Sequence, residues 1–135
     1  MKNLSQRHGD TEKINSLSGQ LIAAAIEVHK ALGPGLLESV YQKCLAYELH
    51  KLDIQCELEK RLSVRYKDLI FEDAYRTDII IEKELIVEIK AVETILPVHK
   101  AQLLSYLKLS GVKLGLLINF NVPLLKNGIT RIINT

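Results

Sequence analysis

Cysteine, long apolar runs and an apolar leader are what this sequence lacks. Its two cysteines, Cys44 and Cys56, lie in no CxxC pair or cysteine–histidine cluster, which argues against a zinc site and a disulfide framework. No apolar run approaches the roughly 20 residues that cross a membrane. The polar stretch 1–16 lacks the apolar core of a secretion signal. We therefore expect a soluble cytoplasmic protein with no membrane partner.

An excess of charge of one sign is also missing. The chain has 18 basic and 16 acidic residues, a net charge of +2, which is too small to indicate a nucleic-acid partner by itself. Any phosphate binding must then come from local charge or from a metal. The 135 residues, 47% of them hydrophobic, suffice for one globular domain. We assign that domain to residues 17–135 and expect residues 1–16 to be a flexible lead-in.

The most informative stretch is Tyr75–Ala91, because it places two acids and a lysine in otherwise apolar strands. The apolar runs 79–81 and 85–89 are rich in β-branched residues and flank the charged residues 82–84. This pattern predicts a β-hairpin.

The length of the hairpin loop decides whether the two acids meet. A three-residue loop pairs Asp78 with Glu88, whereas a two-residue loop pairs Asp78 with Val87 and turns Glu88 to the opposite face. We expect the three-residue loop. Lys90 shares a face with Glu88 in either register, because the two residues are two apart on one strand. Two carboxylates and an ammonium should therefore converge.

Two carboxylates on rigid strands suit a hard divalent cation such as Mg²⁺, which takes oxygen ligands and keeps waters that phosphate oxygens can replace. Lys90 would add a compact positive charge beside them. The structural alternative is that Glu88 and Lys90 are solvated residues of an edge strand. Other segments of the chain bear on this choice.

Two helices precede the hairpin. The spacing of apolar residues predicts a helix over 17–32, with Ser16 or Ser18 as its N-cap, and a second helix over 37–52 after a Gly-Pro-Gly turn. Glu38 lies in the first turn of the second helix. The helix dipole stabilises an acid there, so a structural role would by itself explain Glu38.

Period-two patterns and one further helix complete the expected fold. Gln102 and Tyr106 are four residues apart and should project side by side from the helix expected at 97–110. By itself, such a pair is typical of the polar edge of a helix. The order of elements predicts an α/β fold in three layers, a mixed sheet of about five strands with helices on both faces. The expected elements are strands at 54–58, 62–66 and 69–71, a helix at 97–110, a buried strand at 113–120 and an edge strand at 128–135.

These residues resemble a known family. Gly35–Tyr41, GLLESVY, matches the GxxExxY signature of a group of small bacterial and archaeal proteins within the PD-(D/E)XK nuclease superfamily. The resemblance runs from about Leu17 to the end, through RTDIIIEKELIVEIKAVE, PVHKAQLLSYLK and GLLINF. Thr77 stands where the superfamily name has its proline. The resemblance implies a restriction-endonuclease-like fold.

The resemblance also implies a metal site. Asp78 looks like the metal-binding aspartate of the superfamily, and Glu88 looks like the acid of its ExK element. These two carboxylates and the backbone carbonyl of Ile89 would hold Mg²⁺ or Mn²⁺. Glu38 would help to ligate this ion or a second one.

The remaining candidates are implied to act on the substrate. Lys90 would position or activate the attacking water and stabilise negative charge, and Gln102 and Tyr106 would contact the phosphate backbone or hold the acids and the lysine in place. The implied function is hydrolysis of phosphodiester bonds in DNA, or in RNA, with a homodimer left open. Two alternatives remain: an inactive nucleic-acid- or partner-binding module of the same fold, and a small phosphatase-like metal hydrolase, which would need a closed pocket.

Overall fold

The computed structural model describes residues 4–135, with side chains from residue 11 onward. The elements, in chain order, are α1 (Leu4–Leu32), α2 (Glu38–Lys51), β1 (Cys56–Leu58), β2 (Arg61–Tyr66), β3 (Leu69–Arg76), β4 (Ile79–Ile81), β5 (Leu85–Lys90), α3 (Pro97–Ser110), β6 (Leu114–Asn119), the 3-10 helix η1 (Leu125–Gly128) and β7 (Ile129–Ile133).

Five strands form one mixed sheet in the order β1-β4-β5-β6-β7. β5 and β6 are parallel, and the other neighbours are antiparallel. β6 is buried along its whole length, as the nearly continuous apolar run 113–120 predicts for a strand covered on both faces. The predicted mixed sheet of about five strands is confirmed.

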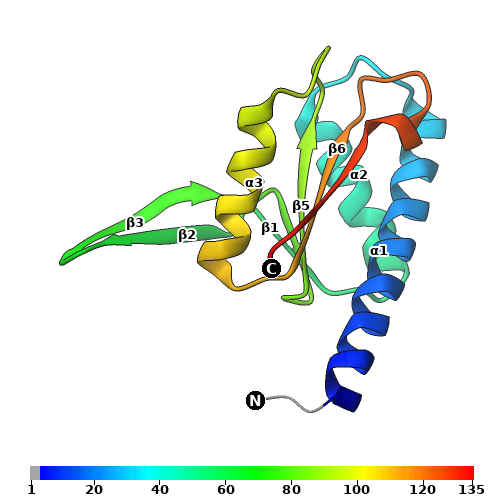
Figure 1. Cartoon of the computed structure of the whole chain (residues 1–135). Coiled ribbons are helices and arrows are strands. Elements are labelled where there is room, and N and C mark those ends of the chain that lie inside the picture. The colour runs from blue at the N-terminus through cyan, green and yellow to red at the C-terminus, as the bar shows by residue number, and fades with distance from the viewer. Residues whose placement is uncertain (1–3) are drawn as a thin grey trace.

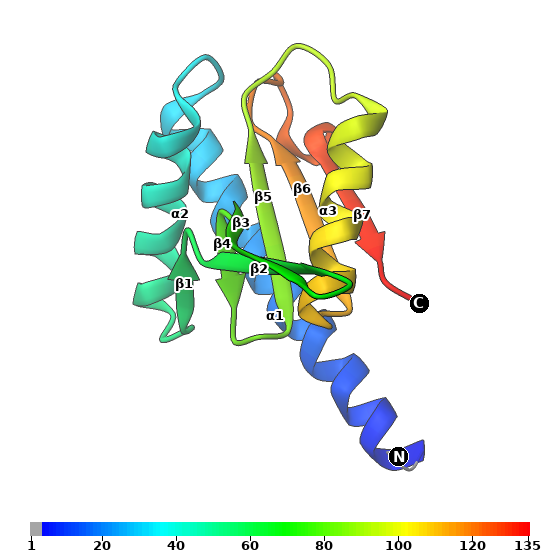
Figure 2. The ribbon, with the colours of Figure 1, turned by 90° about the vertical axis from the view of Figure 1, so that its left-hand side faces the viewer.

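Helices cover both faces of the sheet (Figure 1 and Figure 2). The odd-numbered residues of β4 and β5 face α1 and α2, which bury Leu21, Tyr41 and Leu45 against them. The even-numbered residues face α3, which buries Leu103 and Leu107. Because side chains alternate along a strand, this parity assigns every residue of the hairpin to one layer.

α1 begins much earlier than its apolar spacing predicts. The helix starts at Leu4, but among its described side chains the first buried one is that of Leu17. Ser18 is not a cap, because its hydroxyl donates to the Asn15 carbonyl inside the helix at 3.0 Å. Apolar spacing marks only the part of a helix that has a packing partner, and the start of α1 extends past the sheet (Figure 2). Residues 4–16 are thus part of a helix, residues 1–3 lie outside the described residues, and the flexibility expected of the lead-in stays a prediction.

β2 and β3 leave the main sheet as a two-stranded ribbon that projects from the body (Figure 1). The ribbon nevertheless continues the ladder of β1 and β4. Glu59 N–H donates to the Asp78 carbonyl, and Thr77 N–H donates to the Lys60 carbonyl, each at 3.0 Å. The two chain segments therefore form one long ladder that bends at Asp78, where it leaves the sheet.

α3 has the ends that the sequence predicts. Pro97 is its first residue, and Gly111 ends it in a left-handed conformation with φ 75°, which glycine adopts without strain. On the sheet α3 buries Leu103, Tyr106 and Leu107, whereas Val98 is largely exposed. Among residues 4–135, no helix is both long and apolar enough to span a membrane.

Candidate active site

The β4–β5 hairpin has the register that brings two acids together. Ile81 pairs with Leu85 across a loop of three residues. Three steps further along this ladder, just beyond the end of β4, Asp78 lies opposite Glu88. The three-residue loop expected from the sequence is confirmed, and both acids lie on the α3 face.

Each acid accepts a hydrogen bond from the backbone of the opposite strand segment. Glu88 Oε1 accepts from Asp78 N–H at 3.2 Å, and Asp78 Oδ2 accepts from Ile89 N–H at 2.7 Å. Because β4 begins only at Ile79, the carboxylates satisfy backbone donors that lie beyond the last ladder pair. The two side chains are therefore fixed beside each other by the backbone.

The environment of Glu88 disfavours its charge. Only 7% of its surface is exposed. Burial first, and then the negative charge of Asp78, raise the pKa of Glu88 to about 9, although the Asp78 N–H and the Lys90 charge act in the opposite direction. At neutral pH this carboxyl holds a proton unless a cation takes its place.

Lys90 lies two residues after Glu88 and shares its face, as expected. Its side chain is half-buried at the end of β5, close enough for its charge to lower the pKa of Glu88. The Lys90 carbonyl accepts a hydrogen bond from Phe120 N–H at 2.9 Å, which ties the end of β5 to the end of β6. The ammonium therefore sits beside the carboxylate pair on a braced strand.

Two tyrosines line the site. Tyr106 is 7% exposed, and its ring stacks on that of Tyr75 with centroids 4.3 Å apart and planes 8° apart. Burial, followed by the charges of Glu88, Tyr75 and Asp78, raises the pKa of Tyr106 to about 12, so its hydroxyl keeps its proton at neutral pH. Gln102, one turn earlier on α3, is exposed.

Glu38 does not join the two acids. It is exposed in the first turn of α2, a helix that packs on the face of the sheet opposite α3. Among the described side chains, no group of three or more His, Cys, Asp or Glu could hold a metal ion. The structure thus brings together Asp78, Glu88, Lys90 and Tyr106, and leaves Glu38 and Gln102 in solvent.

Gln42 is a site residue that the sequence pattern did not indicate. It lies one turn after Glu38, is buried, and donates from Nε2 to the Asp78 carbonyl at 2.9 Å. The same carbonyl accepts from Glu59 N–H, so α2 and the ribbon both hold the backbone of Asp78. The one feature of the sequence that could have identified Gln42 is its spacing of four residues from Glu38.

The donors at the hairpin fit a hard divalent cation. Asp78 and Glu88 supply carboxylate oxygens, and the Ile89 carbonyl lies on the same edge of β5 as the Ile89 N–H, which meets Asp78. Magnesium is commonly held by one or two carboxylates and keeps several waters. This donor set therefore fits magnesium with water and substrate oxygens completing its coordination.

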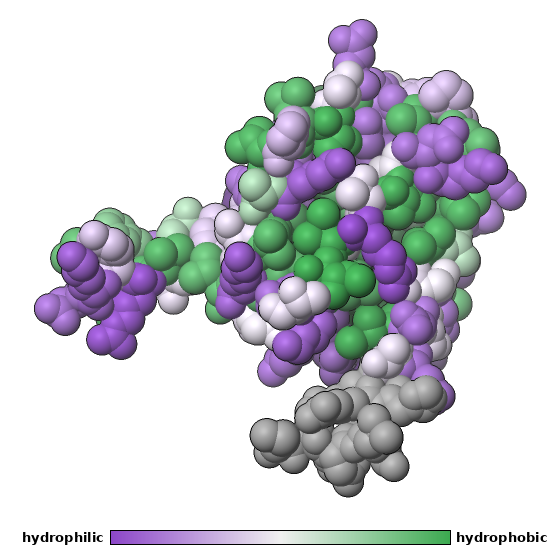
Figure 3. Space-filling view, viewed as in Figure 1, coloured by the Kyte–Doolittle hydropathy of each residue, from purple (hydrophilic) through white to green (hydrophobic). Residues whose placement is uncertain are grey.

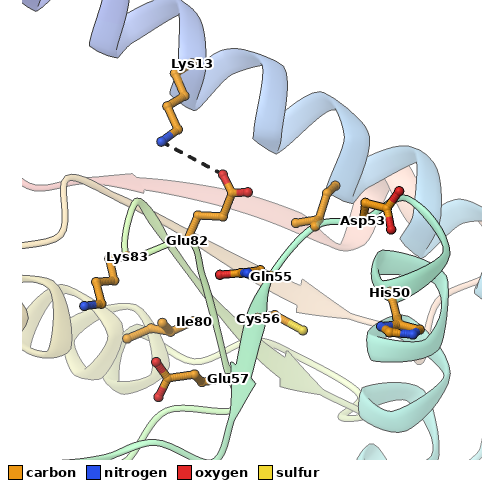
Figure 4. A pocket seen from close by; sticks show the side chains of 10 residues that line it. Lys13, His50, Asp53, Gln55, Cys56, Glu57, Ile80, Glu82 and Lys83 are labelled. Carbon is orange, nitrogen blue, oxygen red and sulfur yellow. Dashed lines mark ion pairs between the residues drawn. The ribbon is translucent and has the colours of Figure 1, made fainter.

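A separate hollow lies elsewhere on the molecule. It has a volume of about 820 Å³ and opens beside β1, with Lys13, His50, Asp53, Cys56 and Glu82 in its wall. Lys13 reaches from α1 to form an ion pair with Glu82 at 4.0 Å (Figure 4). Neither site acid nor Lys90 lines this hollow, so we place the chemistry at the hairpin, where the titratable groups converge.

Comparison with known proteins agrees with this geometry. The family model described as PD-(D/E)XK nuclease superfamily matches residues 15–132. No curated protein matches the chain. A solved structure described as "Crystal structure of SSO0001" is 25% identical over 71% of this chain, with a TM-score of 0.47, and this chain spans about half of it, 48%. Since the family model covers nearly the whole chain and the sheet, helices and acid pair have the expected arrangement, the chain belongs to the PD-(D/E)XK nuclease superfamily.

Proposed function

We propose that this protein is a metal-dependent nuclease of the GxxExxY group that hydrolyses phosphodiester bonds of DNA, or of RNA. One observation carries the proposal: Asp78 and Glu88 are held side by side by the backbone N–H groups of Ile89 and Asp78, beside Lys90. A pair of acids held at this cost in charge repulsion is typical of a site that binds a cation.

Asp78, Glu88 and the Ile89 carbonyl would hold magnesium or manganese. When bound, such an ion polarises a phosphate oxygen and lowers the pKa of a coordinated water. Glu88 would release its proton on binding, because a metal ligand must be deprotonated. Glu38, one turn before Gln42, would contribute through a bridging water.

The other residues would act on the phosphate. Lys90 places a positive charge where negative charge develops during attack, which stabilises the transition state. Tyr106 keeps its proton and can donate a hydrogen bond to a phosphate oxygen or to Glu88. Gln102 is exposed on the same flank of α3 and is free to contact the phosphate backbone.

A second candidate is a binding module of the same fold that does not cleave. The exposure of Glu38, together with the lack of a three-ligand group among the described side chains, favours it. In that case Asp78, Glu88 and Lys90 would serve as a structural ion cluster, and nucleic acid would bind without metal-dependent turnover.

The deciding experiment is a cleavage assay on single- and double-stranded DNA and RNA with Mg²⁺ or Mn²⁺. The wild type should cleave at least one substrate, and EDTA should stop it. Glu88→Ala should be inactive, and Lys90→Ala should lose about 100-fold or more in kcat while keeping its fold. Glu93→Gln, which changes an exposed acid just after β5, is the matched control. Absence of metal-dependent cleavage on every substrate would leave the binding module.

A further inference from the structure

The ribbon of β2 and β3 carries most of its apolar side chains on one side; Ile70, paired with Arg65, lies on the other. Residues opposite each other in an antiparallel pair point to the same side, and the ladder pairs three sets of apolar residues. We call this side the ribbon face; it consists of Leu62, Val64, Tyr66, Leu69, Phe71 and Tyr75.

The ribbon face is covered at its root and bare towards its tip. At the root, Tyr75 stacks on Tyr106 of α3. Further out, Tyr66, Leu69 and Phe71 are 58%, 57% and 53% exposed. Figure 3 shows hydrophobic side chains along the projecting ribbon and hydrophilic ones at its tip. A two-stranded hairpin is only marginally stable alone, and contiguous exposed apolar surface marks a binding site.

Tyr75, at the root of the ribbon face, has a hydroxyl that is buried without a hydrogen-bond partner among the described residues. Nearly all buried polar groups in native proteins are paired, so an orphan needs an explanation. This hydroxyl belongs to the ring that stacks on Tyr106, beside the acid pair. A donor left open there is available to an oxygen of a bound ligand.

Positive charge accompanies the bare part of the ribbon face. At the root, Arg61 pairs with Asp73 at 3.4 Å. At the tip, Lys67 pairs with no carboxylate among the described side chains and lies 5.3 Å from the centre of the Tyr66 ring. Arg65 lies on the other side of the ribbon and donates from Nε to the Lys67 carbonyl at 3.0 Å. Asp68 is the one acid between residues 63 and 71. The tip of the ribbon face therefore combines aromatic rings with the Lys67 cation.

Building on the proposed function, we propose that the ribbon face binds an unpaired stretch of the nucleic-acid strand that enters the Asp78–Glu88 site. Aromatic and apolar side chains stack on bases only when the bases are unstacked from one another, and cations beside them hold the phosphates. The face begins at Tyr75, next to the acids, so one strand can lie on both. Tyr66 and Phe71 are the stacking residues, and Lys67, over the Tyr66 ring, holds the backbone.

The test measures binding in EDTA, so that cleavage does not interfere. Fluorescence anisotropy would compare a labelled single-stranded DNA 20-mer, its RNA equivalent and the blunt DNA duplex. Tyr66→Ala and Phe71→Ala should each weaken single-strand binding about 5- to 100-fold and change duplex binding much less. Tyr66→Phe should restore the affinity. Tyr47→Ala, which removes a 63% exposed tyrosine of α2, is the matched control and should bind like the wild type.

Lys67→Ala should reduce the salt dependence of single-strand binding, by roughly 0.7 in the slope of log K against log salt. Unchanged single-strand affinity in Tyr66→Ala and Phe71→Ala would overturn the proposal. So would a wild-type dimer that Phe71→Ala converts to a monomer without loss of oligonucleotide binding, because the ribbon face would then hold a second copy of the chain. If the ribbon face binds single strands but no metal-dependent cleavage is found, the proposed hydrolysis is wrong and the proposal for the ribbon face still holds.

Discussion

At the residue scale, the Glu88 carboxyl couples folding to pH. Its pKa is about 9 in the folded protein, against 4.5 ordinarily. Between these values the folded state binds a proton that the unfolded chain has released, so stability falls as pH rises through this window. One such group contributes at most about 1.4 kcal/mol per pH unit. Glu88→Gln should flatten this slope and be more stable than the wild type at pH 8.

Urea unfolding in EDTA across this pH window measures the effect. Glu93→Gln, an exposed substitution a few residues later, should keep the wild-type slope. Identical slopes for Glu88→Gln and the wild type would show that the folded protein does not hold this proton.

Gln42 is a positioning residue for Asp78. Gln42→Leu keeps the size of the side chain but removes the donor to the Asp78 carbonyl. That carbonyl keeps its bond from Glu59 N–H, so we expect a moderate loss of stability, about 1 kcal/mol. Cleavage should lose kcat more than KM changes, because Asp78 is displaced while the ribbon stays intact. Gln20→Leu on the exposed side of α1 is the control, and equal kcat values would reduce Gln42 to a packing residue.

The sequence predicted the position of a single residue correctly where the alternation of side chains along a strand was enough to decide it. Strand alternation and loop length were enough to place Asp78 opposite Glu88. The contacts of Gln42 and the stacking of Tyr75 on Tyr106 depend on how α2, α3 and the ribbon meet, which no local pattern encodes. Glu38 shows the same limit, since its helix was predicted but not its exposure.

At the scale of elements, α3 packs closely against β6 at Gly115. A Cβ on Gly115 would lie 3.0 Å from three side-chain atoms of the fully buried Leu103. Gly115→Ala should therefore lower stability by about 1–3 kcal/mol through overpacking. It should also lower cleavage, because α3 carries Tyr106 to Glu88.

A second glycine gives the matched control. Gly19 lies within α1, and a Cβ there would meet nothing within 4 Å. Gly19→Ala should raise stability by about 0.5–1 kcal/mol. Thermal unfolding of both variants checks the pair, and equal midpoints would show that α3 can shift on the sheet without cost.

Element types followed from the sequence, whereas their extent and partners did not. The apolar spacing found the packed part of α1 but not its start at Leu4, because Ile14 is the one described residue before Leu17 that packs against the core. Strands at 62–66 and 69–71 were predicted, although β3 continues to Arg76. That the two strands leave the sheet was not, because exposed and buried strands can share one pattern.

At the scale of the whole molecule, metal binding should be visible as stability. A ligand that binds only the folded state at 100 times its Kd adds about 2.7 kcal/mol, which raises Tm by several degrees. Mg²⁺ or Mn²⁺ should shift the wild type in this way and leave Asp78→Asn/Glu88→Gln unmoved. Without metal, the double variant should be at least as stable as the wild type, because no buried carboxyl then has to take up a proton on folding. A wild type that does not respond to millimolar metal would contradict the site.

The overall architecture was predictable because one signal dominated it. A nearly continuous apolar run such as β6 is expected only where helices cover both faces of a sheet. The hairpin with its charged loop and the Pro97–Gly111 boundaries of α3 then left few arrangements to consider. The bend of the long ladder at Asp78 could not be foreseen.

Because the long ladder bends at Asp78, we expect the ribbon to move relative to the main sheet about this residue. The Asp78 backbone is part of the ladder that runs out to the tip, while Glu88 stays in the main sheet. An oligonucleotide that moves or holds the tip of the ribbon should therefore affect the distance between Asp78 and Glu88. The Ile89 amide, whose bond to Asp78 spans this joint, reports on it. We expect its hydrogen exchange to slow when an oligonucleotide holds the ribbon, and unchanged exchange would mean that tip and joint move independently.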